Sequence, residues 1–178
     1  MTTELSPRAR EIVAVARQLL EEKGPAGLSM RRLADRVGIR ASSIYKHLPD
    51  KQALEHAIVS TVFEELADEF EAALEHADPV GTMVAIYRRY AKDHPHLYRL
   101  MTEQPLQRDL LVPGVEERAS LPARLLVGDD PDAGRALWAF AHGMTILELN
   151  DRFPPSADID AAWRAGFDAF RRYAENAQ

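Results

Sequence analysis

Hydrophobic residues recur along this chain with the spacing of α-helices. In one long stretch the apolar side chains return at every fourth position: Leu54, Ile58, Val62, Leu66, Phe70 and Leu74. No useful length alternates with a period of two, and runs of β-branched residues are absent. The pattern therefore predicts an all-α fold, which prolines, glycines and capping residues divide into about nine helices.

The first 50 residues predict three short helices packed together. A helix is expected over residues 7–23, because a proline stands at its start and Gly-Pro follows its end. Ser29 is the predicted N-cap of a second helix over 30–37, and a third helix is expected over about 41–48. Two short helices joined by a turn that contains Gly38 are the outline of a helix-turn-helix.

The rest of the chain predicts a larger helical domain. A long helix over about 50–77 is expected to be capped by Asp50. Further helices are predicted over 79–94, 95–102, 132–151 and 158–176, with short or kinked helices in the proline-rich stretch 103–131. We therefore expect a DNA-binding domain over residues 1–52 and a ligand-binding and dimerisation domain over 53–178.

The charges are distributed unevenly between these two parts. The chain has 178 residues and a net charge of −6. Residues 1–52 hold ten Lys and Arg against six Asp and Glu, whereas the remainder holds twelve against twenty-two. A basic head on an acidic body suits a polyanionic partner at one end only.

Composition and missing motifs exclude several other classes of protein. The chain has no cysteine, which excludes disulfides and thiolate metal sites. It has no apolar run of membrane-spanning length and no signal-peptide pattern at its start, so we expect a cytoplasmic protein. Gly-x-Ser-x-Gly, a phosphate-binding glycine loop and His-Glu-x-x-His are all missing. We therefore expect neither an enzyme nor a bound cofactor.

In a helix-turn-helix, the second helix enters the major groove of DNA and presents its first residues to the base edges. With Ile44 and Leu48 turned inward, the other side chains of the third helix face outward, and its first residues are small enough for a close approach. Its Tyr, Lys and His side chains can donate to phosphate oxygens. These outward residues are Ala41, Ser42, Ser43, Tyr45, Lys46 and His47.

The stretch from Ser29 to Leu54 resembles the N-terminal signature of the TetR family of transcriptional regulators. The matching features are Leu33-Ala34, Gly38, Tyr45-x-His47, and Lys51 followed by Leu54. The resemblance implies that Tyr45, His47 and Lys51 hold the DNA backbone. It also places Arg31, Ala41, Ser42, Ser43 and Lys46 near bases, with Ser29 and Arg40 in the same surface. Arg31 could form a bidentate contact with guanine O6 and N7.

The segment 136–149 is apolar on nearly every face, so it must be buried all round. A second copy of the chain is the economical cover, and Gly166 in the last helix would allow a close approach. Two helices from each subunit would form a four-helix bundle about a two-fold axis. The residues predicted for this interface are Trp138, His142, Thr145, Leu149, Trp163, Gly166, Phe167 and Phe170.

Trp138 and His142-Gly143 also resemble a C-terminal domain of some TetR-family members that is named for Trp-His-Gly (WHG-type). This resemblance implies regulation and dimerisation, and it names neither a ligand nor an operator. Methionines beside aromatic residues suit an adaptable, mostly apolar cavity. The candidate lining residues for a small-molecule ligand are Phe63, Phe70, Met83, Tyr87, Tyr90, Tyr98, Met101, Phe140 and Met144.

The sequence therefore predicts a homodimeric repressor that binds a pseudo-palindromic operator in double-stranded DNA and leaves it when a small molecule binds. Two alternatives remain open on the same fold. One is a metal-responsive regulator in which His94, His96 and His142 converge, although no acidic third ligand is evident. The other is an activator or a nucleoid-type DNA binder.

Overall fold

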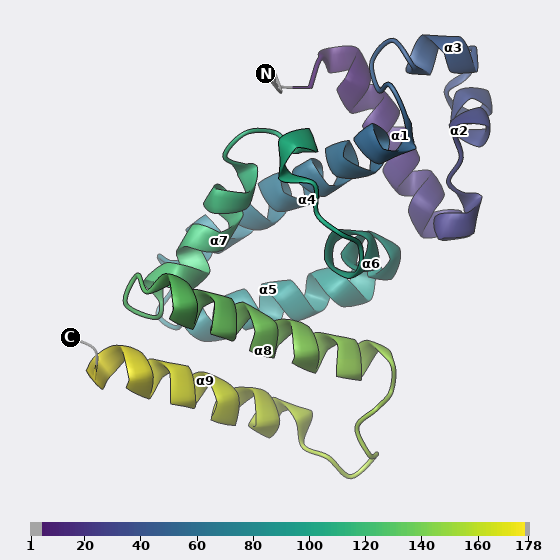
Figure 1. The fold of residues 1–178 in the computed structure, drawn as a ribbon. Coiled ribbons are helices and arrows are strands. Elements are labelled where there is room, and N and C mark those ends of the chain that lie inside the picture. Colours follow the sequence, from purple (N-terminus) through teal and green to yellow (C-terminus); the bar gives the residue numbers. More distant parts are fainter. Residues whose placement is uncertain (1–4, 177–178) are drawn as a thin grey trace. The chain divides into compact units, whose positions relative to one another are not determined.

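The computed structural model describes residues 5–176 and confirms the all-α prediction. Nine α-helices and two short 3-10 helices follow one another in the described chain (Figure 1). No helix in this part of the chain combines the length and the apolar character that a membrane span requires. The elements form two compact units, which comprise residues 5–65 with 94–116, and residues 66–93 with 117–176.

The first unit begins with α1 (Pro7–Lys23), the 3-10 helix η1 (Pro25–Gly27), α2 (Met30–Val37) and α3 (Ala41–Ile44). Of these elements, α1 and α2 have the bounds that the sequence predicted. The Ser6 hydroxyl caps α1, because its oxygen accepts the Ala9 N–H at 3.2 Å. Gly38 ends α2 with φ 73°, a left-handed conformation that glycine adopts without a steric cost.

The third helix is shorter than the predicted span to residue 48. It ends at Ile44, and a tight turn follows, in which the backbone N–H groups of His47 and Leu48 both donate to the Ile44 carbonyl at 2.9 Å. The bond from His47 has the i+3 spacing of a 3-10 helix, and the bond from Leu48 has the i+4 spacing of an α-helix. Pro49 prevents the helix from continuing. The turn brings the Leu48 side chain back to the core.

The first unit also contains part of α4 (Lys51–Ala73), together with α6 (Pro95–Glu103) and η2 (Arg108–Leu110). Asp50 caps α4 as predicted, since its carboxylate accepts the Ala53 N–H at 2.7 Å. The helix ends at Ala73, before the expected end near 77, in a series of short turns. The core of this unit includes Ile12, Leu20, Leu33, Ile44, Leu54, Ile58 and Tyr98.

The second unit contains α5 (Pro79–Asp93), α8 (Pro131–Leu149), α9 (Ile159–Asn176) and most of α7 (Val115–Leu125). Helix α8 packs against both α5 and α9. Asp78 caps α5 by accepting the Gly81 N–H at 3.0 Å, and Asp130 caps α8. Pro122 lies inside α7, which agrees with the expectation of short or kinked helices in the proline-rich stretch.

Candidate nucleic-acid interface

Helix α3 is held by its apolar side and presents its polar side to solvent. Ile44 is 0% exposed and Leu48 is 3% exposed, as the sequence predicted. Tyr45 is 47% exposed, although large aromatic side chains are usually covered. Ser42, Lys46 and His47 are also exposed, whereas Ala41 and Ser43 are half-buried.

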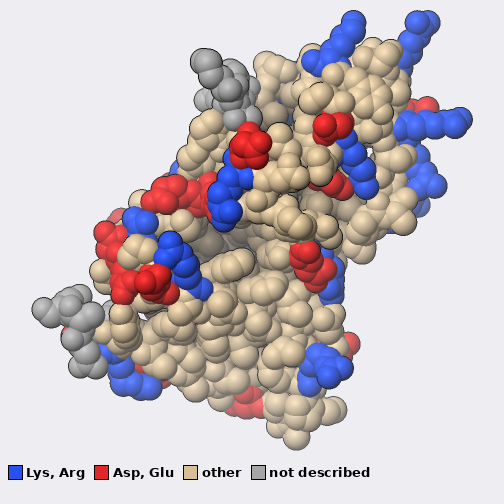
Figure 2. All heavy atoms as spheres, in the orientation of Figure 1, with Lys and Arg blue, Asp and Glu red and all other residues tan. Residues whose placement is uncertain are grey.

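Several cations around α3 are left without an acceptor or an opposite charge in the part of the chain that the structure describes. Among the described residues, the charged groups of Arg31, Arg40 and Lys46 have no hydrogen bond or ion pair, and all three side chains are exposed. Lys51 pairs with Glu55 at 3.3 Å, one helical turn further along α4, and such exposed pairs are weak. Figure 2 shows Lys and Arg side chains projecting from the part of the first unit that holds α2 and α3 (upper right).

Ser29 lies at the start of this surface and serves the helix itself. Its hydroxyl oxygen accepts the Arg32 N–H at 3.3 Å and so caps α2, as predicted. The cap fixes where α2 begins, and Arg31, the second residue of α2, projects outward from that first turn. The predicted DNA-binding residues therefore come from α2, from α3 and the turn after it, and from the first residue of α4.

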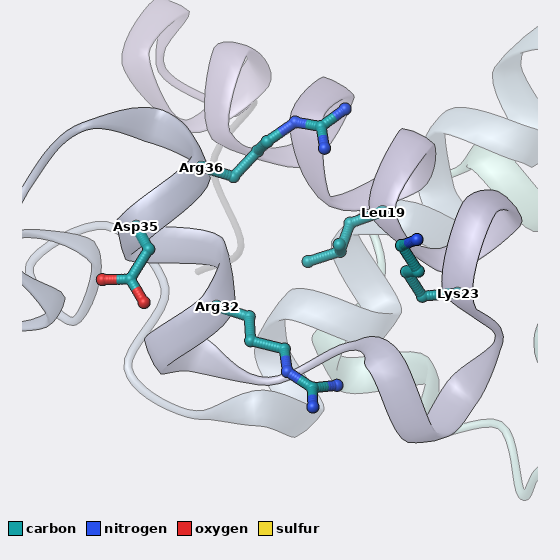
Figure 3. A pocket seen from close by; sticks show the side chains of 5 residues that line it. All are labelled: Leu19, Lys23, Arg32, Asp35 and Arg36. Carbon is teal, nitrogen blue, oxygen red and sulfur yellow. The ribbon is translucent and has the colours of Figure 1, made fainter.

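An open groove of about 450 Å³ lies beside these residues, between α1 and α2. Figure 3 shows its lining side chains, which are Leu19, Lys23, Arg32, Asp35 and Arg36. Two of its cations have partners: Arg32 donates to the Ala26 carbonyl at 3.2 Å, and Arg36 pairs with Glu22 at 2.8 Å. We therefore assign the groove to the packing of α1 on α2 and not to a ligand.

The residues predicted to line a ligand cavity are divided between the two units. Tyr98 and Met101 are buried in the first unit, where Phe63 is half-buried. In the second unit, Phe70, Met83, Tyr87 and Tyr90 are buried, and Met144 is half-buried. Phe140 also belongs to the second unit, and its ring contacts Trp163, Phe167 and Phe170 on α9. Within the second unit, Phe140 thus joins the aromatic residues that were predicted for the dimer interface.

The predicted interface residues have two different environments. Trp163 is only 2% exposed, and its ring stacks on Phe167. A Cβ atom added to Gly166 would lie 2.0 Å from a ring carbon of Phe140, so this glycine admits a side chain of its own chain. Thr145 is also buried, and its hydroxyl has no hydrogen-bond partner in the described structure.

Trp138, in contrast, projects into solvent. It is 53% exposed and stacks on the ring of His142 at a centroid distance of 5.8 Å. Leu147 is also exposed, but it lies two and a half turns further along α8 and so on the opposite side of the helix. Gly143 lies between them in sequence, with nothing within 4 Å of a Cβ atom added there. The described residues thus leave the face of α8 that carries Trp138 partly uncovered.

A buried carboxylate, which the sequence analysis missed, links three helices of the second unit. Glu148 on α8 binds Arg88 at 3.0 Å and Lys92 at 3.0 Å, both on α5. It also accepts the indole N–H of Trp163 on α9. Burial raises the pKa of Glu148, but the hydrogen bonds from Trp163, Lys92 and Arg88 outweigh that effect and hold its pKa below the ordinary value. No local signal marks these partners, since they lie on different helices.

The histidines proposed for a metal site have other surroundings. The His96 ring lies 3.4 Å from a Cβ atom placed on Gly24, and His142 stacks on Trp138. Over residues 5–176, no group of three or more His, Asp or Glu side chains is placed to hold a metal ion. The metal-responsive alternative therefore lacks a donor set in this part of the chain.

Two family models match this chain, one at each end. The model described as "Bacterial regulatory proteins, tetR family" matches residues 12–58. The model described as "Tetracyclin repressor-like, C-terminal domain" matches residues 80–170. The first match includes the cap residue Ser29, all of α3 and the start of α4, so it covers the surface described above.

Individual relatives agree with these matches. An HTH-type transcriptional regulator of Saccharopolyspora erythraea is 34% identical over 96 residues, which are 54% of this chain and 41% of that protein. The structure of a protein of unknown function from Rhodococcus sp. RHA1 has a TM-score of 0.71 at 26% identity, with 95% of this chain and 96% of that one covered. The Streptomyces coelicolor TetR family protein ActR, in complex with (S)-DNPA, has a TM-score of 0.68 at 20% identity, with 96% and 98% covered, and so shows a shared fold.

Proposed function

This chain belongs to the TetR family of bacterial regulatory proteins, and from that premise we propose that it is a dimeric repressor which a small, mostly apolar molecule releases from its operator. Membership makes the chain a DNA-binding transcriptional regulator. Repression, the two-fold dimer and the ligand are what we propose beyond membership. Because its target is DNA, we also propose that it acts in the cytoplasm.

The observation that carries the proposal is the outward polar side of α3 above a buried Ile44, next to cations that have no partner over residues 5–176. A cation already bound to a carboxylate must break that bond before it can reach a phosphate. Arg31, Arg40 and Lys46 can bind phosphates without first breaking an ion pair. When cations neutralise phosphates, counterions are released from the DNA, and this release favours binding. We propose that Tyr45, His47 and Lys51 contact phosphates, and that Arg31, Ala41, Ser42, Ser43 and Lys46 approach the base edges.

We propose that the uncovered face of α8 binds a second copy of the chain. Trp138 is 53% exposed there and stacks on His142, and exposed apolar surface is a common site of association. An aromatic anchor suits the centre of such an interface. A two-fold dimer would present two α3 helices to the two halves of a palindrome. Trp138 and His142-Gly143 support our further assignment of the C-terminal domain to the WHG type.

For the ligand, we propose a cavity lined by the buried Met and Tyr residues of α5, including Met83, Tyr87 and Tyr90. Flexible Met side chains adapt to an apolar molecule, and Tyr hydroxyls provide polar contacts. ActR, which shares this fold, binds a small molecule. For release to occur, the ligand must prefer the DNA-incompetent state. We propose that its binding moves α4 as a lever and so changes the separation of the two DNA-binding domains of the dimer.

Selection from a random duplex library with the purified protein tests this function. We expect a pseudo-palindrome with half-sites about one helical turn apart. Affinity for the selected duplex should fall steeply with salt and should exceed the affinity for a scrambled duplex by about 10³-fold or more. Weak, salt-sensitive binding without enrichment of any sequence would contradict the assignment.

A reporter gene placed behind the selected site then distinguishes repression from activation. We expect expression of this protein to lower reporter output, because a repressor competes with the transcription machinery for the promoter. A matched reporter with the scrambled site is the control. Increased output from the selected site would support the activator alternative and contradict repression.

A further inference from the structure

Within the first unit, residues 94–112 are held against α1 and α4 through their own backbone. Three N–H groups of this segment donate to side chains of α1 and α4. The Leu97 N–H binds Glu21 at 2.7 Å, the Gln107 N–H binds His56 Nε2 at 3.0 Å, and the Val112 N–H binds the Ser60 hydroxyl oxygen at 3.0 Å. Figure 1 shows the chain after α6 running beside α4 towards α7. We call residues 104–112 the strap.

His56 and Ser60 lie one turn apart on α4 and are both buried, with exposures of 8% and 0%. The second nitrogen of His56, Nδ1, lies 2.8 Å from the Gln52 carbonyl, so Nδ1 carries the ring proton and donates it. Nε2 is then free to accept from Gln107. The Ser60 hydroxyl donates to the His56 carbonyl at 2.9 Å, which leaves its oxygen to accept from Val112. The ring nitrogens of His56 and the hydroxyl of Ser60 are thus all used within the chain, and neither residue is among the proposed DNA contacts.

Protonation of His56 would remove its role as an acceptor. An imidazolium donates from both nitrogens, so an N–H on Nε2 would face the N–H of Gln107. The small cavity next to His56 is lined from α6 and the strap by Leu100, Gln104, Pro105 and Leu106, none of which is charged. The charged residue in this lining is Glu55, on α4 itself, and it pairs with Lys51. A buried cation without an acceptor is costly.

We propose that His56 is a proton-sensitive latch, which holds the strap on α4 as the neutral imidazole and releases it when the imidazole is protonated. Imidazoles change charge between about pH 5 and 8, so mild acidification should open the strap. Strap opening goes beyond the proposed function and does not depend on it. The effect of strap opening on DNA binding does depend on the proposed function. Helix α4 begins with Lys51, a proposed phosphate contact, so loss of the strap from α4 should weaken operator binding.

Amide hydrogen exchange of the full-length protein tests the latch. Exchange of peptides that cover residues 104–112 is measured from pH 7.5 to pH 5 and corrected with an unstructured reference peptide. We expect wild-type protection to fall by about tenfold per pH unit below the transition, because one proton is coupled to opening. The variant His56→Gln has an amide oxygen near the position of Nε2 and does not titrate, so its strap should stay protected. His76→Gln removes an exposed histidine of the second unit and should behave as wild type.

Three results would overturn the latch. The first is the same pH dependence in wild type and His56→Gln. The second is a protected wild-type strap at a pH where the NMR signals of the His56 ring show it protonated. The third is a His56 ring that stays neutral down to pH 5. If His56→Gln does not fold, Ser60→Ala is used in its place. This variant removes the acceptor of the Val112 N–H, so amide exchange near residue 112 should become faster at pH 7.5. Unchanged exchange there would contradict the attachment of the strap to α4.

Measurements of operator affinity at two pH values distinguish failure of the latch from failure of the proposed function. With the selected duplex, wild-type Kd should rise about tenfold between pH 7.5 and pH 5.5, and the Kd of His56→Gln should rise less. Equal changes in both proteins, with an open wild-type strap, would overturn the coupling to DNA. If no operator is selected at all, the proposed function fails, while the exchange experiment still decides the latch.

Discussion

The helix-turn-helix of the first unit and the α8–α9 hairpin of the second use the same kinds of side chain in opposite ways. Around α3, Arg31, Arg40 and Lys46 have no partner in the described chain. In the second unit, Arg88 binds Glu148 and Asp160, and Arg118 binds Asp68 and Glu71. Cations are thus left available in one region and neutralised in the other.

The aromatic residues follow the same contrast. Tyr45 projects from the end of α3 into solvent. Trp163 of α9, in contrast, is buried under the guanidinium of Arg88 on α5, whose carbon is 5.4 Å from the ring centroid. Residue type alone therefore does not indicate which side chains are available to a partner. What matters is whether the chain already satisfies them, and each prediction below changes one such contact.

The largest expected effect is on the small core beneath α3. Ile44→Ala removes a fully buried side chain and should lower the free energy of unfolding by about 2–5 kcal/mol, with loss of operator binding. Denaturant unfolding measures the first effect and duplex binding the second. Ser42→Ala, on the exposed side of α3, is the matched control and should change stability by less than about 0.5 kcal/mol. Equal stabilities for the two variants would show that α3 does not depend on this core.

The second prediction concerns the uncovered face of α8. Trp138→Ala should weaken the dimer by about 2 kcal/mol or more, roughly 30-fold in the dissociation constant, because exposed aromatic anchors dominate such interfaces. Sedimentation equilibrium measures the change. Leu125→Ala, which removes an exposed apolar residue of α7, is the control. The same dissociation constant for both variants would place the interface elsewhere.

The third prediction compares two glycines of the hairpin. Gly166→Ala places a methyl group against the Phe140 ring and should lower the free energy of unfolding by about 1–3 kcal/mol. Gly143→Ala meets nothing within the chain and should be neutral or stabilising by up to about 1 kcal/mol. Denaturant unfolding in a Trp138→Ala background keeps dissociation out of the comparison. Two equal values would contradict the close packing of α8 on α9.

The fourth prediction separates two kinds of DNA contact. Arg31→Ala should cost about 1–3 kcal/mol at one base position of the operator. Lys51→Ala should weaken binding to all sequences similarly and lower the slope of log affinity against log salt by about one. Binding to operator variants over a salt series measures both. If Arg31→Ala weakened every variant equally, its assignment to a base edge would be wrong.

The smallest expected effect is the pH dependence of the Glu148 cluster. The pKa of Glu148 is lowered in the folded protein, so its stabilisation is present above the unfolded value of about 4.3 and is lost as pH falls towards the folded value. Glu148→Gln should cost about 1 kcal/mol near pH 6, and this difference should shrink by pH 3. Glu117→Gln, at an exposed pair, is the control. A difference that stays constant over this range would contradict the cluster.

The sequence by itself determined the bounds of α1 and α2 and the buried side of α3. The start and end of α1 and α2, the cap at Ser29, and the burial of Ile44 and Leu48 were all predicted and are confirmed. Caps and periodicity act between residues at most four positions apart, so the local sequence contains them in full. The proposed roles of the outward residues remain predictions.

The tertiary structure alone decided which distant residues satisfy one another. Gly166 contacts the ring of Phe140 in its own chain. Glu148 binds partners on α5 and α9. His56 accepts a backbone N–H from a residue 51 positions away. These contacts depend on how helices pack, and helix packing joins residues that no periodicity relates. A glycine, a glutamate or a histidine looks the same in the sequence whether its partner is solvent, another helix or a second subunit, and only the packed chain distinguishes these cases.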